Sequence, residues 1–300
     1  MIAVYTLLFP GLVFSLFCGM IAWWIERKLS ALFQHRVGPP WYQNFVDFFK
    51  LMGKESIVPE DSASLMYTIA PMIAFASIVS FATVLGGAVF LKTEIAGDLI
   101  LLLYLSSLIS TAIFLGASAS ANVYAAIGAS RELKMLLSDE LVFIMVVLVP
   151  VAKSGFSFRL GGLFDNPAIA SFSGIVAYIL GLLCIQAKLA LQPFDLPEAE
   201  TEIAGGVEIE YSGVLLGIWK LTKGMEFFVY PLFLSVLFFG VKKGFSGLLL
   251  NVLFYFLTLI LLIVMKNVNP RVTIEKMLNF FWKILSPLAL IVLIIALFGG

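Results

Sequence analysis

The chain has 300 residues, of which 61% are hydrophobic and 13% carry a charge. Charged residues alone usually make up about a quarter of a soluble domain, so this composition excludes an ordinary soluble protein and indicates an integral membrane protein. Nineteen basic and nineteen acidic residues give a formal net charge of zero. The charge balance therefore argues against a nucleic-acid partner and against an acidic solvating tail.

Residues that bind metals are scarce. His35 is the one histidine, and Cys18 and Cys184 lie far apart inside apolar runs. A HExxH zinc site needs two histidines, and an iron–sulfur cluster needs about four cysteine ligands. The chain is therefore expected to hold no metal and no redox cofactor of its own. Glycine-rich nucleotide motifs and catalytic triads are also missing from the sequence.

Apolar runs long enough to cross about 30 Å of hydrocarbon occur eight times along the chain. Because lipid cannot hydrogen-bond to backbone amides, each run is predicted to be a helix. The predicted fold class is thus an all-α polytopic membrane protein, with a single membrane domain over 1–300. The first run lacks a basic leader and a cleavage motif, so we expect it to be retained. The approximate spans are 2–25, 65–91, 98–121, 138–153, 170–191, 213–240, 247–265 and 280–298.

The distribution of basic residues predicts the orientation. Lysine and arginine in short loops stay on the cytoplasmic side of a membrane, and here they favour the odd-numbered loops. We therefore expect a multi-pass protein of the cell membrane whose loops at 26–64, 122–137 and 192–212 face the cytoplasm.

The first loop is predicted to contain a helix that lies in the membrane interface. The segment 37–40 reads Val-Gly-Pro-Pro, which must end the helix that continues from the first span. From 41 to 52, apolar residues recur every three to four positions opposite Asp47 and Lys50. That amphipathic pattern is typical of an interfacial helix.

The fifth loop carries a cluster of carboxylates, which allows two interpretations. It is either a solvated charged loop or a set of desolvated carboxylates that exchange protons near neutral pH. The apolar, turn-forming stretches PFDLP and AGG favour the second interpretation, and Glu200 and Glu202 are the two residues expected to be desolvated. The cluster comprises Asp195, Glu198, Glu200, Glu202, Glu208 and Glu210.

For two other acidic residues, the sequence is consistent with either a structural or a functional role. Glu140 follows Asp139 at the start of the fourth span, where acids also stabilise a helix N-terminus through its dipole. Glu226 lies inside the sixth span, one turn from Lys223, so it fits either an ion path or a local pair.

An ordered set of motifs resembles a known family. The stretches ERK, QHRVGPP, DFFKLMGKE, GASRE and PFDLPEAETEIAGG, followed by EIEYSG, are similar to those of the H-type, or first, membrane subunit of respiratory complex I. They also resemble the related subunit of energy-converting membrane-bound nickel–iron hydrogenases. The short first loop and the double glycine Gly205-Gly206 are most similar to the hydrogenase, formate hydrogenlyase and sulfane reductase branch.

The resemblance implies a membrane anchor and coupling subunit of a redox-driven, ion-pumping oxidoreductase complex. Such a subunit docks a peripheral electron-transfer arm and links its reaction to proton or sodium translocation. The implied partners are peripheral hydrogenase-like and iron–sulfur subunits and antiporter-like membrane subunits within the lipid bilayer. Iron–sulfur clusters and a nickel–iron site would belong to those partners.

The same resemblance assigns residues to two roles. Those implied in the proton path or coupling are Glu26, Glu140, Asp195, Glu198, Glu200, Glu202 and Glu210. Those implied as arm-docking residues or charge partners are Arg27, Arg36, Asp47, Lys50 and Arg131. Glu208 has no firm counterpart in the motif.

Three alternatives remain beside this interpretation. The first is the quinone-site subunit of a complex I NADH:quinone oxidoreductase. The second is a free-standing secondary ion transporter, which predicts polar breaks within the spans of two related halves; the acids here cluster in loops instead, and the halves show no repeat. The third is a purely structural anchor.

The chain purified without partners is expected to contain neither iron nor nickel, because the sequence supplies no set of metal ligands. Elemental analysis of the isolated chain, run beside the native complex, is the measurement. A metal signal stoichiometric with the isolated chain would contradict this expectation.

Overall fold

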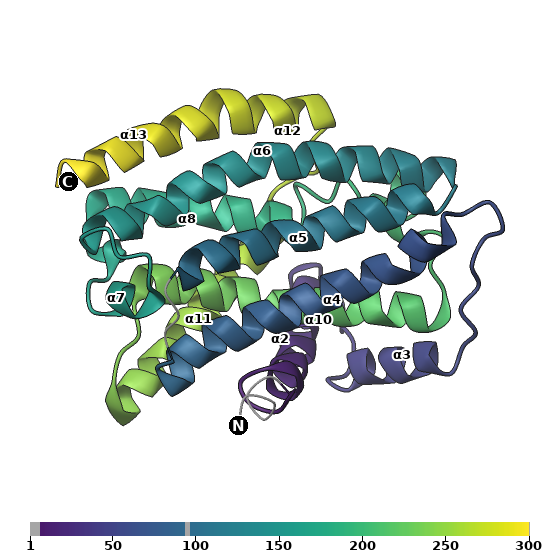
Figure 1. Ribbon diagram of the computed structural model, residues 1–300, viewed down its shortest axis with the longest axis horizontal. Helices are drawn as coiled ribbons and strands as arrows, with labels where there is room; N and C mark the ends of the chain where they lie inside the picture. Colours follow the sequence, from purple (N-terminus) through teal and green to yellow (C-terminus); the bar gives the residue numbers. More distant parts are fainter. Residues whose placement is uncertain (1–6, 94–96, 300) are drawn as a thin grey trace.

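The computed structural model describes residues 7–93 and 97–299, and this part of the chain is built of helices with no strand. In Figure 1, α4, α5, α6, α8 and α10 run side by side, while α2 crosses them. The elements are α2 (Leu12–Phe33), α3 (Gln43–Met52), α4 (Ser64–Gly86), η1 (Gly87–Leu91), α5 (Asp98–Ala119), α6 (Val123–Lys153), α7 (Leu160–Phe164), η2 (Ala168–Ala170), α8 (Phe172–Lys188), α9 (Glu200–Ile203), η3 (Gly206–Glu208), α10 (Gly213–Phe239), α11 (Gly244–Val268), α12 (Ile274–Phe280), η4 (Phe281–Leu285) and α13 (Ser286–Leu297).

The all-α polytopic fold is confirmed, although the number of clear spans differs from eight. Among the described residues, six helical segments are long and apolar enough to cross a membrane, and the pair 160–170 and 172–188, bent by 105°, would make a seventh. The remaining predicted span, 2–25, corresponds to α2, which carries three charged residues in its second half and is not among the six. Residues 2–6 of that span lie outside the described part. The six segments are Ser64–Leu91, Asp98–Ala119, Val123–Lys153, Gly213–Phe239, Gly244–Val268 and Ile274–Leu297.

The prediction of a loop at 122–137 is wrong, because this stretch caps and begins a long helix. The Asn122 side chain accepts hydrogen bonds from the backbone N–H groups of Tyr124 and Ala125. From there α6 continues for 31 residues, which is about 46 Å at 1.5 Å per residue. Charged residues lowered the hydropathy of the GASRE stretch, but they do not break a helix when other elements supply their partners.

The amphipathic helix predicted at 41–52 is observed as α3. It packs against α2 and α10 and lies beside them in Figure 1. Asn44 is buried on the inner face of α3 and donates a 3.0 Å hydrogen bond from Nδ2 to the Met20 carbonyl of α2. A side-chain contact with the backbone therefore fixes this helix to the first span.

Helix α10 forms the centre of the bundle. It packs against α2, α4, α8 and α11, and its large side chains Phe227, Tyr230 and Phe233 are buried. Glycine permits the close approach of α2, because a Cβ atom on Gly19 would lie 2.6 Å from the Gly224 carbonyl oxygen. Small residues at such crossings let membrane helices pack backbone against backbone.

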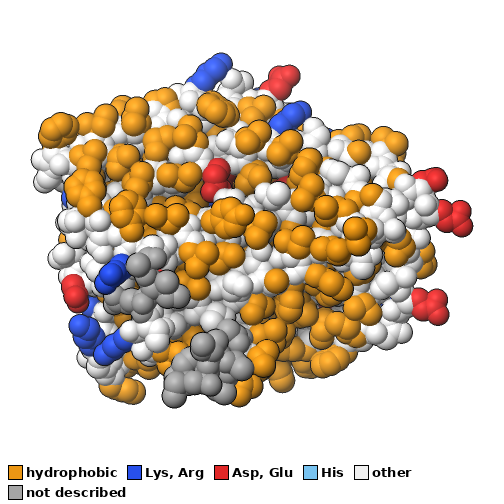
Figure 2. All heavy atoms as spheres, viewed as in Figure 1, with side chains coloured by type: hydrophobic (Ala, Val, Ile, Leu, Met, Phe, Trp, Pro, Cys, Tyr) orange, Lys and Arg blue, Asp and Glu red, His pale blue; other side chains and the backbone are white. Residues whose placement is uncertain are grey.

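The outer helices expose apolar surface instead. Only 28% of the most apolar window of α11 is buried, and the same share holds for the α12–α13 segment. Hydrophobic side chains dominate the face of the molecule seen in Figure 2. Such a surface is expected for helices that contact lipid or neighbouring membrane subunits.

The segments that carry the sequence motifs meet at one end of the bundle. The backbone N–H of Ile57 donates to Ser212 Oγ at 2.9 Å, and that of Val214 donates to Ser56 Oγ at 3.0 Å. Asn122 Nδ2 donates to Glu210 Oε1 at 2.5 Å. The first loop, the start of α6 and the fifth loop thus form one surface.

Single cysteines introduced at Gln43 and Thr201 are expected to react with a membrane-impermeant maleimide from the cytoplasmic side. Ser246→Cys, at the start of α11 and so at the other end of the bundle, is the control and should react from the outside. Labelling of Gln43→Cys and Thr201→Cys from opposite sides, or of both from the outside, would overturn the orientation.

Candidate functional site

A cavity of about 710 Å³ lies between the first-loop and fifth-loop motifs. Its walls come from α2, α3, the segment 190–201, α10 and the end of α11. Acidic and basic side chains are equally represented in these walls, so the cavity is suited to water and ions. The charged wall residues are Glu26, Arg27, Asp47, Asp195, Glu198, Glu200, Lys220, Lys223, Lys266 and Arg271.

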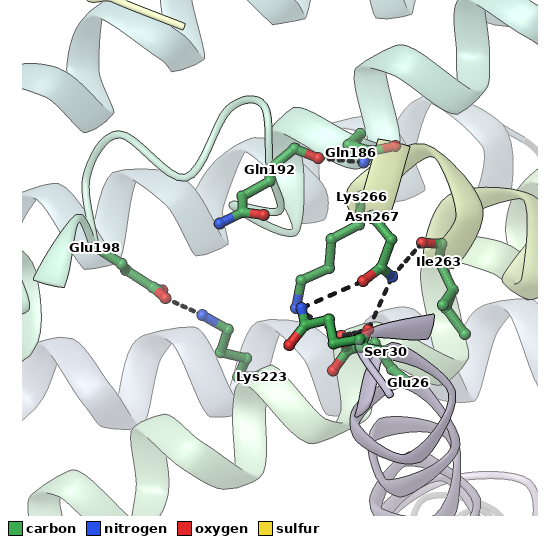
Figure 3. A network of polar contacts seen from close by, with 10 residues as sticks. Glu26, Ser30, Gln186, Gln192, Glu198, Lys223, Ile263, Lys266 and Asn267 are labelled. Carbon is green, nitrogen blue, oxygen red and sulfur yellow. Dashed lines mark hydrogen bonds and ion pairs between the residues drawn. The ribbon is translucent and has the colours of Figure 1, made fainter. Parts of the chain in front are cut away.

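Glu26 is buried in this wall and joins α2 to α11. Lys266 Nζ lies 2.6 Å from Glu26 Oε1, and Ser30 Oγ donates to the same oxygen at 3.0 Å. Asn267 Nδ2 in turn donates to Ser30 Oγ at 3.1 Å, as Figure 3 shows. A buried carboxylate is costly unless it is paired and hydrogen-bonded, and this network supplies both kinds of partner.

Arg27 joins the first span to α3. Its Nη1 donates to Asn44 Oδ1 at 2.6 Å and lies 3.5 Å from Asp47 Oδ2. The other two residues assigned to this loop, Arg36 and Lys50, have exposed side chains. They therefore lie on the outer surface of the motif end and not in the cavity wall.

Two carboxylates of the fifth loop form ion pairs with lysines of α10 that lie one helical turn apart. Glu198 pairs with Lys223, as drawn in Figure 3, and Glu208 pairs with Lys220. Burial would raise the pKa of Glu208, but the positive charges of Lys220 and Lys223 outweigh it and hold the pKa below its ordinary value. Glu208 has no firm counterpart in the sequence motif. It is nevertheless one of the ionised groups that attach the fifth loop to the bundle.

Arginines hold the outer part of the fifth loop. Arg271 forms a two-pronged pair with Asp195 and donates to Thr201 Oγ1 at 2.8 Å. The paired Asp195 carboxylate raises the pKa of Arg271. From α6, Arg131 Nη1 lies 2.6 Å from Glu202 Oε2.

A double glycine allows the fifth loop to lie close against α6. Gly206 has a left-handed φ of 50°, and a Cβ atom there would collide with the Pro197 carbonyl. On the facing helix, a Cβ atom on Gly128 would lie 2.9 Å from the Val207 nitrogen. Larger residues at either position would push the loop, and with it Glu198, away from α10.

The prediction that Glu200 and Glu202 are desolvated is wrong. Both side chains are exposed: Glu200 lines the cavity, and Glu202 pairs with Arg131 while its side chain stays 46% exposed. They lie two residues apart on the short helix α9. Glu210 is half-buried, and its carboxylate instead accepts from Asn122 at the start of α6.

Three further deeply buried carboxylates lie within the spanning helices. Glu132 and Asp139 of α6 and Glu226 of α10 are each 5% exposed or less. The sequence motifs assigned no role to Glu132, Asp139 was noted only as an acid at the start of the fourth span, and Glu226 was left open between an ion path and a local pair. The signal was present, because an ionisable residue inside a long apolar helix indicates a functional position in a membrane protein.

A charged cluster joins α5, α6 and α8 in the interior. Lys188 Nζ lies 3.1 Å from Asp139 Oδ2 and 3.0 Å from Glu140 Oε2. Ser107 Oγ donates to the other Glu140 oxygen at 2.6 Å. Glu140, predicted to belong to the ion path, is thus half-buried and paired with a buried lysine that lies 48 residues away in the sequence.

A second, smaller cavity connects the fifth loop to the interior. It has a volume of about 20 Å³, which is enough for one water molecule. Glu198, Glu208, Lys223 and Glu226 all line it. Since Glu198 and Lys223 also line the large cavity, this ion pair lies between the two spaces.

Similarity to known proteins extends over nearly the whole chain. A family described as NADH dehydrogenase matches residues 6–297. The H-type subunit of NADH-quinone oxidoreductase from Helicobacter acinonychis (strain Sheeba) is 32% identical over 305 residues, covering 91% of this chain and 90% of the relative. A solved structure of the membrane-bound sulfane sulfur reductase, an archaeal respiratory membrane complex, contains a chain that is 27% identical, with a TM-score of 0.86 and 98% of each chain covered.

Replacing Lys188 by methionine is expected to destabilise the bundle by about 3–5 kcal/mol, because the buried Asp139 and the half-buried Glu140 both lose their partner. Adding Asp139→Asn should recover part of that loss, since one uncompensated charge is removed. The control is Lys243→Met, whose pairing with Asp165 is weak because both side chains are about three-quarters exposed. Thermal unfolding in detergent is the measurement, and equal midpoints for Lys188→Met and Lys243→Met would contradict the buried pair.

Proposed function

Because the chain belongs to the NADH dehydrogenase family, that of the H-type membrane subunit of complex I, we propose that it anchors and couples a redox-driven ion pump. It is a membrane subunit of a complex I-like respiratory oxidoreductase complex. In the proposal it docks the peripheral electron-transfer arm and links the redox reaction to proton or sodium movement. The Glu198–Lys223 pair between the two cavities carries the proposal, because one moving loop can make and break it.

The first step of the proposed coupling is a displacement of the fifth loop. Its outer part, including Glu200 and Glu202, is exposed at the motif end, where an arm would press on it. Its inner part holds Glu198 against Lys223. A shift of the docked arm is therefore transmitted to an ion pair inside the protein.

The second step is electrostatic. When Glu198 leaves, the ammonium of Lys223 faces Glu226, which lines the same small cavity one helical turn away. An unpaired positive charge favours the ionised carboxylate, so Glu226 releases a proton, and it takes one up again when Glu198 returns. Glu132 of α6 is also buried, and in the proposal it extends the route toward α6 and the Lys188 cluster.

The docking floor is proposed to consist of the exposed surfaces of 26–64, the start of α6 and 192–212. Arg36 and Lys50 project from it, and Arg27, Asp47 and Arg131 hold its segments together. In this proposal the floor faces the cytoplasm of the cell membrane. Peripheral hydrogenase-like and iron–sulfur subunits, which hold the metal centres, bind there, and antiporter-like subunits contact the apolar faces of the bundle.

Between the two branches, we favour a ferredoxin-linked hydrogenase or sulfane reductase. The TM-score of 0.86 over 98% of both chains and the short first loop support this choice. The walls of the large cavity carry many charges. Such walls are better solvated by water than by the apolar tail of a quinone, because small-molecule sites are lined mainly by hydrophobic groups. The alternative is a quinone-site subunit, which the 32% identity to a relative from NADH-quinone oxidoreductase supports.

Glu198→Gln and Lys223→Met, made separately in the native complex, are expected to retain redox turnover and lose most of the ion gradient formed per electron. Each removes one charge of the pair that the fifth loop controls. Glu275→Gln is the matched control, because this exposed glutamate lies on α12, outside both cavities. Assembly is checked first, and a gradient per electron equal to that of the control in both variants would refute the coupling role.

The choice between a ferredoxin-linked and a quinone-linked complex is tested on the purified native complex. A ferredoxin-linked complex is expected to oxidise reduced ferredoxin without added quinone, and a nickel signal would identify the hydrogenase type. Quinone reduction by NADH, with no ferredoxin activity, would favour the alternative branch.

A further inference from the structure

An apolar groove is formed on the bundle by residues that do not line the charged cavity. It has a volume of about 330 Å³ and lies between α2, α10 and α11. Its walls include Phe14 and Cys18 of α2, Phe228 of α10, and Val252 and Tyr255 of α11. None of its lining residues belongs to the ion pairs described above.

The groove spans the depth of one membrane leaflet. On α11 its wall extends from Leu248 to Phe256, which is about 12 Å of helix at 1.5 Å per residue. One leaflet contributes about half of the 30 Å hydrocarbon thickness. The groove begins next to the turn at 240–243 that joins α10 to α11, so it leads from the membrane surface toward the bilayer centre.

Two lysines stand at the surface end of the groove. Lys242 and Lys243 are both exposed, and Lys243 lies 3.6 Å from an exposed Asp165. In the part of the chain that the structure describes, no carboxylate pairs with the Lys242 ammonium.

The lysine turn is fixed to the groove by Asn251, which itself lines the wall. The Lys242 backbone N–H donates to Asn251 Oδ1 at 2.9 Å, and Asn251 Nδ2 donates to the Lys242 carbonyl at 3.1 Å. The turn that carries the two lysines is therefore fixed beside the apolar slot, next to the lining residues Gly240 and Val241.

We propose that the groove binds one acyl chain of an anionic phospholipid whose phosphate lies against Lys242 and Lys243. Charge at the surface end, apolar walls below it and a depth of one leaflet together match the two parts of that molecule. A transmembrane helix of a partner subunit fits less well, because a helix with its side chains is 10–12 Å wide and the slot holds about 330 Å³ along its whole length.

The native Cys18 provides a reporter for this site. Its side chain is half-buried in the groove wall, whereas Cys184 is fully buried elsewhere. An acyl chain in the groove covers the Cys18 thiol, so reaction with N-ethylmaleimide slows when the site is filled. Mass spectrometry of the Cys18 peptide reads this reaction separately from cysteines of other subunits.

The experiment uses the native complex stripped of lipid with detergent and returned to nanodiscs. Palmitoyl-oleoyl phosphatidylglycerol is expected to slow Cys18 labelling several-fold relative to phosphatidylcholine with the same acyl chains. Lys242→Gln combined with Lys243→Gln should abolish that difference. Equal labelling in the two lipids would overturn the anionic site, and protection of Cys18 that persists in the stripped complex would identify a protein occupant instead.

A matched pair of variants tests the groove itself. Val252 lines the slot and its neighbour Leu253 does not, and their side chains are 46% and 56% exposed. Val252→Trp should fill the slot and remove co-purified phosphatidylglycerol in native mass spectrometry, whereas Leu253→Trp should retain it. Both positions face outward, so both variants should assemble, and equal lipid retention in the two would refute the site.

Discussion

Buried carboxylates pair with lysines of other helices in this bundle, and the arrangement of the helices depends on how those charges are paired. Lys188 joins α8 to α6 through Asp139 and Glu140, and Lys266 joins α11 to Glu26 of α2. Removing one partner from a buried pair is strongly destabilising, even though the intact pair contributes little net stability. The pairs therefore act mainly by permitting only a few relative positions of the helices.

The fifth loop uses the same kind of interaction in a segment with little regular structure. It has little regular structure beyond the short elements α9 and η3, and ion pairs to α6, α10 and the segment after α11 hold it. Contacts of this kind can be exchanged without unfolding the bundle. That difference separates the interior cluster, which is enclosed by helices, from Glu198–Lys223, which can respond to events at the surface.

The two ends of the molecule have opposite chemistry. At the motif end, the first loop, the start of α6 and the fifth loop form a polar surface above a charged cavity. Toward the other end, α2, α10 and α11 line an apolar groove. Helix α10 contributes to both, with lysines in its first half and phenylalanines in its second, so a single helix connects the proposed coupling site to the proposed lipid site.

Composition and periodicity by themselves determined the membrane class, the all-α fold, the interfacial helix α3 and the ordered motifs of the family. These properties depend on the lengths of apolar runs and on neighbouring residues, which one sequence displays directly. The tertiary structure decided that 123–137 is helical and that Glu198 and Glu208, rather than Glu200 and Glu202, face lysines. It also decided that Lys188 forms an ion pair with Glu140. Whether a charge is solvated or buried depends on which distant helix covers it, and the partners here come from up to 240 residues away, beyond the reach of any local pattern.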